Sequence, residues 1–463
     1  MYYNFVILLY HNKTFFKILV EILSEVNIVI IYVNDFKKDN ISDTQAINDA
    51  IKYCNQNGGG TIYFSANCTY RAGMIRLLDN VELYFESNAI LKASDNILDF
   101  SEDKNLNIQS ISAPTFENCD YNGQPDKFFI YANNAKNIKI SGCGIIDGNE
   151  EIFYGKVSKW HIDGFFYPRV PLIYFENCEN VCISDITLQR SAFWTTHLVG
   201  CRNVIINNIK ILNNLKLANC DGIDPDHCQN VVIKNCYIEA ADDCIVFKTT
   251  SIGKAYGECR DIEVSGCTLI STSAAIKFGT ESVSDFKNIY IHDCNILKSN
   301  RGIAFMLRDE GNISNIRFEN INIDTRRFSH IYWWGKGEPI CITAVKRIKE
   351  GKLGNIKDIY FKNIKMDCES PIFIYGYDDS KISDLKFVDL KMNLNNKTNY
   401  QKDIYDLRPC EEYQIITMPM SIIKIFNANN IEFDNFSYSV DENIKSYIQK
   451  EFDINNSKNI NLK

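Results

Sequence analysis

QNVVIKNCYI, the stretch Gln229–Ile238, is a ten-residue phrase that recurs along most of the chain. It returns as RNVIINNIKI at Arg202–Ile211 and as RDIEVSGCTL at Arg260–Leu269. Each copy opens with a polar residue and Asn or Asp, and its apolar residues then alternate with the period of a β-strand. A second, shorter polar-to-apolar step closes the phrase. Further copies begin at Lys136, Glu179, Lys287 and Ser314, and fainter ones at Lys357, Ser383 and Asn429.

The spacing of the copies predicts the architecture. Between Glu179 and Ser314 the copies begin 23 to 31 residues apart, a period typical of solenoids and propellers. No helical pattern of ten residues separates them, which excludes a leucine-rich repeat or an α/β barrel. Turns of about 25 residues with several short strands indicate an all-β fold, a right-handed parallel β-helix, in which each rung buries its inward residues against its neighbours.

The open end of such a stack needs a cap, because it exposes the core and unpaired strand edges. Ser42 is a good N-cap for a helix over about residues 43–57. Its predicted buried face is Ala46, Ile47, Ala50, Ile51 and Cys54. We expect residues 1–31 to form an N-terminal extension and residues 32–463 a single β-helix domain, with the catalytic rungs at about 200–310.

Composition and charge narrow the class of protein. The chain has 463 residues, 45% of them hydrophobic, and a net charge of −8, which argues against nucleic acid as a partner. Its 17 cysteines include no Cys-x-x-Cys pair, and many fall at one place in the repeat. They are therefore expected to be small buried core residues, and reduced thiols favour a reducing compartment.

The N-terminal segment carries an apolar run at Phe5–Tyr10 that is short and has no basic residue before it. No run approaches the roughly 20 apolar residues that a membrane span needs. We therefore expect a cytoplasmic protein without a membrane partner, with secretion as the alternative if the start site lies elsewhere. The sequence does not determine the oligomeric state.

Acidic residues concentrate in two neighbouring rungs. NCDGIDPD covers Asn219–Asp226 and ADDC covers Ala241–Cys244. Asp221 and Asp242 lie slightly less than one turn apart, and residues one rung apart stack at about 4.8 Å. The carboxylates should therefore converge on one outer face and raise one another's pKa. Glycoside hydrolysis needs such a protonated acid beside a carboxylate, whereas Asp224 and Asp226 are expected to be turn or support residues.

These motifs together resemble glycoside hydrolase family 28, the polygalacturonases. The resemblance begins at Tyr32–Phe64, continues through ISGCGIIDGN at Ile140–Asn149 and SAFWTTHLVGCRNV at Ser191–Val204, and reaches at least Arg308. It implies an enzyme that hydrolyses pectin-type chains, galacturonan or rhamnogalacturonan, with pectic polysaccharide or oligosaccharide as its partner and no metal or cofactor.

The resemblance also implies roles for individual residues. Asp242 would be the general acid, and Asp221 and Asp243 would position and deprotonate the attacking water, with inversion at the anomeric carbon. Asn219 matches the first residue of the family's Asn-Thr-Asp motif, in which Cys220 replaces Thr. Lys248 matches a position that holds a substrate oxygen.

Two family motifs are absent. Ser273-Ala274-Ala275 replaces Gly-His-Gly, and Ala304 and Met306 stand where the Arg and Lys of Arg-Ile-Lys would fall. Losing both cations removes a charge-assisted hold on galacturonate, so another cation replaces them or the sugar differs. The residues expected to bind substrate in their place or beside them are Lys277, Glu281, Arg301, Arg308, His197 and Trp333, the last as part of a sugar-stacking Trp pair.

Two other functions remain open. A polysaccharide lyase on the same architecture would need calcium held by carboxylates and a basic residue that abstracts a proton. A non-enzymatic β-helix, such as an adhesin or a tailspike-like binder, would bind glycan without releasing reducing ends.

Overall fold

The computed structural model describes residues 29–100, 109–110, 128–162, 166–167, 169–330, 332–378, 381–412 and 414–463. The apolar run Phe5–Tyr10 and most of the predicted extension lie outside these residues. Among the described residues, no helix has the length and apolar character that crossing a bilayer requires.

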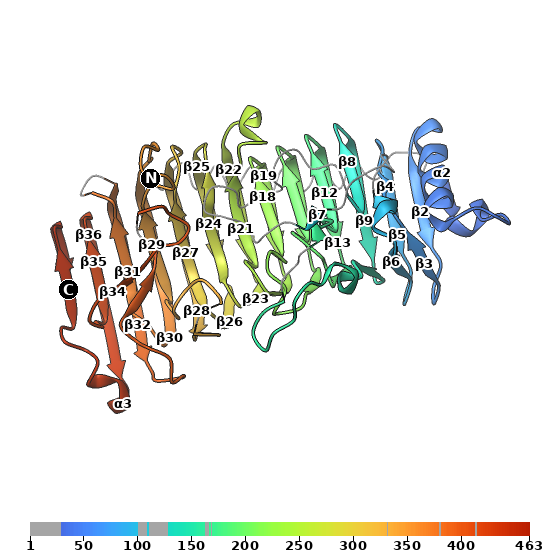
Figure 1. The fold of residues 1–463 in the computed structure, drawn as a ribbon. Helices are drawn as coiled ribbons and strands as arrows, with labels where there is room; N and C mark the ends of the chain where they lie inside the picture. Colours follow the sequence, from blue (N-terminus) through green and yellow to red (C-terminus); the bar gives the residue numbers. More distant parts are fainter. Residues whose placement is uncertain are drawn as a thin grey trace.

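The fold is a right-handed parallel β-helix, as predicted, and Figure 1 shows its rungs stacked along one axis. Each repeated phrase supplies one strand to each of two ladders. The first ladder contains β1 (Val29–Tyr32), β2 (Gly60–Phe64), β5 (Val81–Phe85), β9 (Lys136–Gly142), β13 (Glu179–Ser184), β16 (Arg202–Asn207), β19 (Gln229–Lys234), β22 (Cys259–Ser265) and β25 (Phe286–His292). The second contains β3 (Thr69–Ala72), β6 (Ile90–Ala93), β10 (Ile145–Asp147), β14 (Thr187–Gln189), β17 (Lys210–Leu212), β20 (Tyr237–Ala240), β23 (Thr268–Ser271) and β26 (Asn295–Ser299).

The two ladders merge toward the C-terminus, where single strands run through both. These strands are β28 (Ile313–Thr325), β30 (Ile356–Cys368), β32 (Ile382–Leu394) and β36 (Asn429–Val440), followed by β38 (Lys458–Leu462). Two small antiparallel pairs stand outside the ladders. They are β7 (Gln109–Ser110) with β11 (Phe166–Tyr167), and β33 (Ile404–Asp406) with β34 (Ile415–Thr417).

A third ladder closes each turn of the helix, and it is the one that positions the site. It contains β4 (Ile75–Arg76), β8 (Ile130–Asn133), β12 (Ile173–Glu176), β15 (Thr196–Val199), β18 (Ile223–Asp226), β21 (Ile245–Thr249), β24 (Ala274–Ser282), β27 (Arg301–Leu307), β29 (Ile340–Ala344), β31 (Ile372–Gly376), β35 (Ile423–Phe426) and β37 (Phe452–Asn455). All its pairings are parallel, so side chains from successive rungs line up along the outer face.

The predicted cap is present at the end of the stack where the chain enters it. Helix α2 (Asp43–Gln56) begins after Ser42, whose Oγ accepts a hydrogen bond from the Gln45 amide at 3.2 Å, and it buries the predicted apolar face. Figure 1 shows α2 covering that end. Strand β1 pairs with β2 and begins at Val29, before the boundary predicted at residue 32. The division into residues 1–31 and 32–463 stays a prediction.

The Asn at the second position of most phrases has a structural cause. Asn180, Asn203 and Asn230 all adopt left-handed backbone, with φ of 58°, 58° and 56°, a conformation that Asn tolerates better than other residues with a side chain. Their amides form a ladder between rungs, with Asn203 donating to Asn180 at 3.1 Å and Asn230 to Asn203 at 3.3 Å. The recurring Asn therefore turns the chain and joins the rungs.

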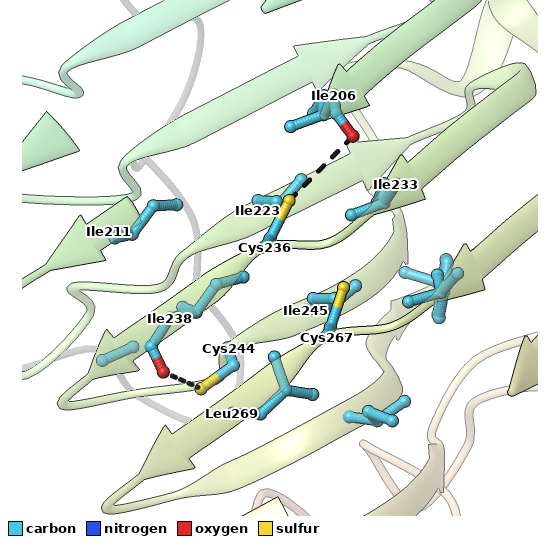
Figure 2. Close-up of a cluster of buried hydrophobic side chains, with 14 of the residues drawn as sticks. Ile206, Ile211, Ile223, Ile233, Cys236, Ile238, Cys244, Ile245, Cys267 and Leu269 are labelled. Carbon is cyan, nitrogen blue, oxygen red and sulfur yellow. Dashed lines mark hydrogen bonds between the residues drawn. The ribbon is translucent and has the colours of Figure 1, made fainter. Parts of the chain in front are cut away.

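The cysteines lie where the repeat predicts. Figure 2 shows Cys236, Cys244 and Cys267 packed among isoleucines inside the stack. The Cys244 thiol donates to the Ile238 carbonyl at 3.6 Å. None of the cysteines in the described ranges forms a disulfide, and most are buried, so they serve as core residues.

The Asn ladder gives a first prediction. Asn203→Ala should lower the free energy of unfolding by about 1–3 kcal/mol, because it adds left-handed strain and removes two hydrogen bonds. Asn203→Gly, the control, loses the same bonds without strain and should cost less. Urea denaturation followed by circular dichroism measures both; an Ala variant as stable as the unaltered protein would contradict the expectation.

Candidate active site

The three predicted catalytic aspartates lie in the turns that lead into the third ladder. Asp221 precedes β18, and Asp242 and Asp243 precede β21 in the next rung. The main chains of the two turns are joined by a hydrogen bond from the Gly222 amide to the Asp243 carbonyl, at 2.8 Å. One carboxylate oxygen of each aspartate lies within 4.8 Å of the other two. Rung stacking therefore brings the three acids together, as the spacing predicts.

The residues beside Asp221 explain how the turns approach so closely. A Cβ atom on Gly222 would lie 2.4 Å from the Cys244 carbonyl oxygen, so only glycine fits at this position. Cys220, where the family has Thr, is buried, and its thiol donates to the Ser191 carbonyl at 2.9 Å. Both residues shape the turn rather than the chemistry.

The electrostatics of the three acids differ. Burial, followed by repulsion from neighbouring carboxylates, raises the pKa of Asp221 well above its ordinary value and also raises that of Asp242. Within the described residues, one Asp221 oxygen is buried without a hydrogen-bond partner. Asp243 has two donors, the Ala274 amide at 3.1 Å and the Lys277 ammonium at 2.5 Å. The cluster thus holds protonatable carboxyls beside a carboxylate that is paired with a cation.

Three clustered carboxylates are also the donors that a divalent cation prefers. Here Lys277 already supplies a positive charge at Asp243. A metal ion in the cluster would lie close to that ammonium, so the donor set fits a cation poorly.

Asn219 connects the cluster to the interior. Its main-chain amide donates a hydrogen bond to Asp242 Oδ2 at 3.1 Å, and its side-chain oxygen accepts one from Arg169 at 2.6 Å. Its backbone is left-handed, with φ of 59°. Asn219 therefore orients the Asp242 carboxyl through the main chain, while buried Arg169 holds its side chain.

A second charged group lies beside the aspartates. The buried Lys248 ammonium is 3.1 Å from Glu281, 3.9 Å from Asp224 and 4.3 Å from the centre of the Trp194 ring. Burial acts to raise the pKa of Glu281, but Lys248 and Arg347 lower it overall. Burial raises the pKa of Asp224 well above its ordinary value. Asp224 is thus a buried acid that faces Lys248, a place that fits the turn or support role expected of it.

These groups open on one cavity of about 310 Å³. Nine of the eleven predicted residues lie in its wall. The predicted residues in the wall are Asp221, Asp242, Asp243, Asn219, Lys248, Lys277, Glu281, Arg301 and Trp333. The sequence reasoning missed His161 and Trp194, which also line it. Trp194 could have been found, because it stands in the quoted Ser191–Val204 motif one rung before Asp221.

Two of the predicted substrate-binding residues lie outside the cavity wall. His197 is 1% exposed between the Trp194 and Tyr174 rings, and its Nε2 lies 3.1 Å from Asp226. The buried guanidinium of Arg308 donates to backbone carbonyls, among them Pro409 at 3.0 Å. Neither lines the cavity, so both hold the surrounding fold.

Aromatic residues from two loops form one side of the cavity. The loop before β12 and the loop before β29 meet where Trp333 Nε1 donates to the Trp160 carbonyl at 2.9 Å. The rings of His161 and Tyr332 stack at 5.5 Å with 9° between their planes. Trp333, 6% exposed, packs in one apolar cluster with Leu217, Cys220 and Ala241 of the catalytic turns. These loops make an aromatic wall beside the acids.

Comparison with known proteins agrees with this fold. The model of glycosyl hydrolases family 28 matches residues 91–410, and the chain belongs to this family. A probable polygalacturonase of Vitis vinifera is 30% identical over 271 residues, which are 56% of this chain and 53% of that protein. The matched part therefore spans about half the length of that relative.

Solved structures with this fold include two exopolygalacturonases. The one from Yersinia enterocolitica has a TM-score of 0.67 and 17% identity, covering 94% of this chain and 78% of that one. The one from Thermotoga maritima has a TM-score of 0.63 and 19% identity, covering 82% and 91%. At these identities the likeness shows the fold alone.

The raised pKa of Asp221 predicts that replacing this residue with Asn stabilises the protein, and that the size of the effect depends on pH. Because its pKa is raised on folding, the native state loses stability as pH rises above the unfolded value near 3.8. Asp221→Asn should therefore raise the free energy of unfolding at pH 7, with a smaller gain at pH 4.

The control is Asp226→Asn. Burial opposes ionisation of Asp226, but hydrogen bonds from His197 and Thr250 lower its pKa overall. This variant should lose stability at pH 7. Urea denaturation at several pH values measures both variants, and a loss of stability in Asp221→Asn at pH 7 would count against the repulsive cluster.

Proposed function

We propose that this protein hydrolyses O-glycosidic bonds in pectin-type polysaccharides or oligosaccharides. The observation that carries the proposal is the set of three carboxylates within 4.8 Å of one another in the wall of a 310 Å³ cavity. Raised pKa values at Asp221 and Asp242 keep a carboxyl protonated where an acid is needed. Membership of glycosyl hydrolases family 28 supports the reaction class.

The three aspartates divide the reaction between them. Asp242, the more exposed of the three, donates a proton to the bridging oxygen as the glycosidic bond breaks. Water then forms the new bond at the anomeric carbon, and its proton passes to Asp221 or Asp243. Lys277 remains paired with Asp243 and holds that carboxylate in position.

The stereochemical course is open to direct measurement. The family resemblance implies inversion. Proton NMR of the first-formed reducing end decides between water held by two carboxylates and direct attack by one.

Removing the proposed acid tests the function. Asp242→Asn should lower kcat on pectic oligosaccharides by about 10²–10⁴-fold, because an amide cannot donate the proton, while the thermal unfolding midpoint stays at or above that of the unaltered protein. Release of reducing ends measures activity. Asp185→Asn, in a turn between the first two ladders, is the matched control and should retain full activity.

Three results would contradict the proposal. Equal turnover by Asp242→Asn and the unaltered protein would remove the acid from its role. Calcium-dependent release of unsaturated uronides would identify a lyase. Glycan binding without any release of reducing ends, over a full panel of pectic oligosaccharides, would identify a binding protein.

A further inference from the structure

Every cation in the cavity wall, among the described residues, already has a carboxylate partner. Lys248, Lys277 and Arg301 line the cavity. Their partners come from this chain itself. The pairs are Lys248 with Glu281 at 3.1 Å, Lys277 with Asp243 at 2.5 Å, and Arg301 with Glu338 at 3.3 Å.

These ion pairs are buried, which makes them hard to exchange for a substrate anion. Lys248 and Lys277 are 3% and 9% exposed, and Asp243 is fully buried. If Lys277 turned to a bound uronate, Asp243 would lose its cation beside Asp242. Leaving a buried charge unpaired costs more than one charge-assisted hydrogen bond to a substrate returns.

Arg301 is held in the same way. Its guanidinium also donates to the Asp406 carbonyl at 2.8 Å, and its partner Glu338 is fully buried. Arg301 Nη1 lies 3.5 Å from the sulfur of Met306, so all three guanidinium nitrogens have partners within the chain. It offers no freely moving guanidinium to a ligand.

The acidic groups of the wall are also unfavourable to an anion. Four carboxyl groups line the cavity, and each of its three cations is already paired with a carboxylate. A uronate at the reacting position would add a further negative charge within a few ångströms of Asp221, Asp242 and Asp243. Like charges at such distances repel strongly where water is excluded.

The remaining lining suits an uncharged ring. Tyr332, Trp333 and Trp334 stand together on the aromatic wall, and Tyr332 is 41% exposed. Aromatic faces pack well on the apolar faces of sugar rings. Met306 contributes further apolar surface from β27.

We propose that the sugar unit bound at the three aspartates carries no free carboxylate, being either a neutral pyranose or a methyl-esterified uronate. The inference rests on the proposed hydrolytic function and deepens it. The ion pairs exclude an ionised uronate, and the aromatic wall accepts the uncharged ring.

Oligogalacturonides of one length, prepared as free acids and as methyl esters, test the proposal. The unaltered protein should cleave the ester with a kcat/KM at least about tenfold higher than the acid at pH 6, and this ratio should fall as salt screens the repulsion. Reducing-end release at low substrate concentration measures both values. Cleavage of a neutral pectic oligosaccharide, with neither galacturonide cut, also supports the proposal.

A matched pair of variants tests whether an added cation improves cleavage of the free acid. Ser273 lines the cavity, and its hydrogen bonds to Ser271 and Arg301 use main-chain atoms of Ser273. Ser273→Lys adds a cation without breaking an ion pair, whereas Ser273→Met adds similar length without charge. The Lys variant should lower the ester-to-acid ratio about tenfold relative to the Met variant. Because the comparison uses the ratio of kcat/KM on the ester to kcat/KM on the acid, a loss of activity that affects both substrates equally does not change the result.

The outcomes separate this inference from the function on which it rests. Cleavage of the free acid as fast as the ester by the unaltered protein would overturn the inference and leave hydrolysis standing. An unchanged ratio in Ser273→Lys, with folding verified by its unfolding midpoint, would also overturn it. No cleavage of any pectic glycan would overturn the proposed function and the inference with it.

Discussion

The in-register stacking of successive rungs is the constraint on which the rest of this molecule depends. Every outward or inward side chain has neighbours about 4.8 Å away in the rungs above and below. For isoleucine and cysteine this proximity is favourable, because apolar atoms leave water together, as Figure 2 shows. For Asn203 it is favourable as well, since amides donate and accept along the ladder. The same stacking therefore builds the core and the turns.

At Asp221, Asp242 and Asp243 the stacking acts in the opposite direction. Three carboxylates are held within 4.8 Å of one another, and burial adds to their repulsion. The surrounding rungs tolerate this because the cooperative ladders over-determine the backbone of the turns, and because Lys277 pairs with Asp243. The same repulsion and burial favour a carboxyl group that keeps its proton, which is what an acid catalyst requires.

The neighbouring loops convert this reactive face into a selective cavity. Unequal loops before β12 and β29 meet through Trp333 and the Trp160 carbonyl, so the acids lie beside an aromatic wall. Lys248 and Lys277 are paired with Glu281 and Asp243. Neither ammonium group is therefore available to bind the charged group of a ligand without losing its partner. The proposed catalytic carboxylates therefore lie in a cavity whose lining cations are each paired with a carboxylate of this chain.

The sequence by itself determined the β-helix, the α2 cap and the meeting of the three aspartates, because strand alternation and rung period are regular along the chain. The rung to which a residue belongs therefore follows from its position in the repeat. Only the tertiary structure decided which predicted residues face the cavity. His197 and Arg308 turn to buried partners, and His161 arrives on a loop. Loop lengths vary between rungs, and ion pairs join residues more than 30 positions apart, so no local pattern records these contacts.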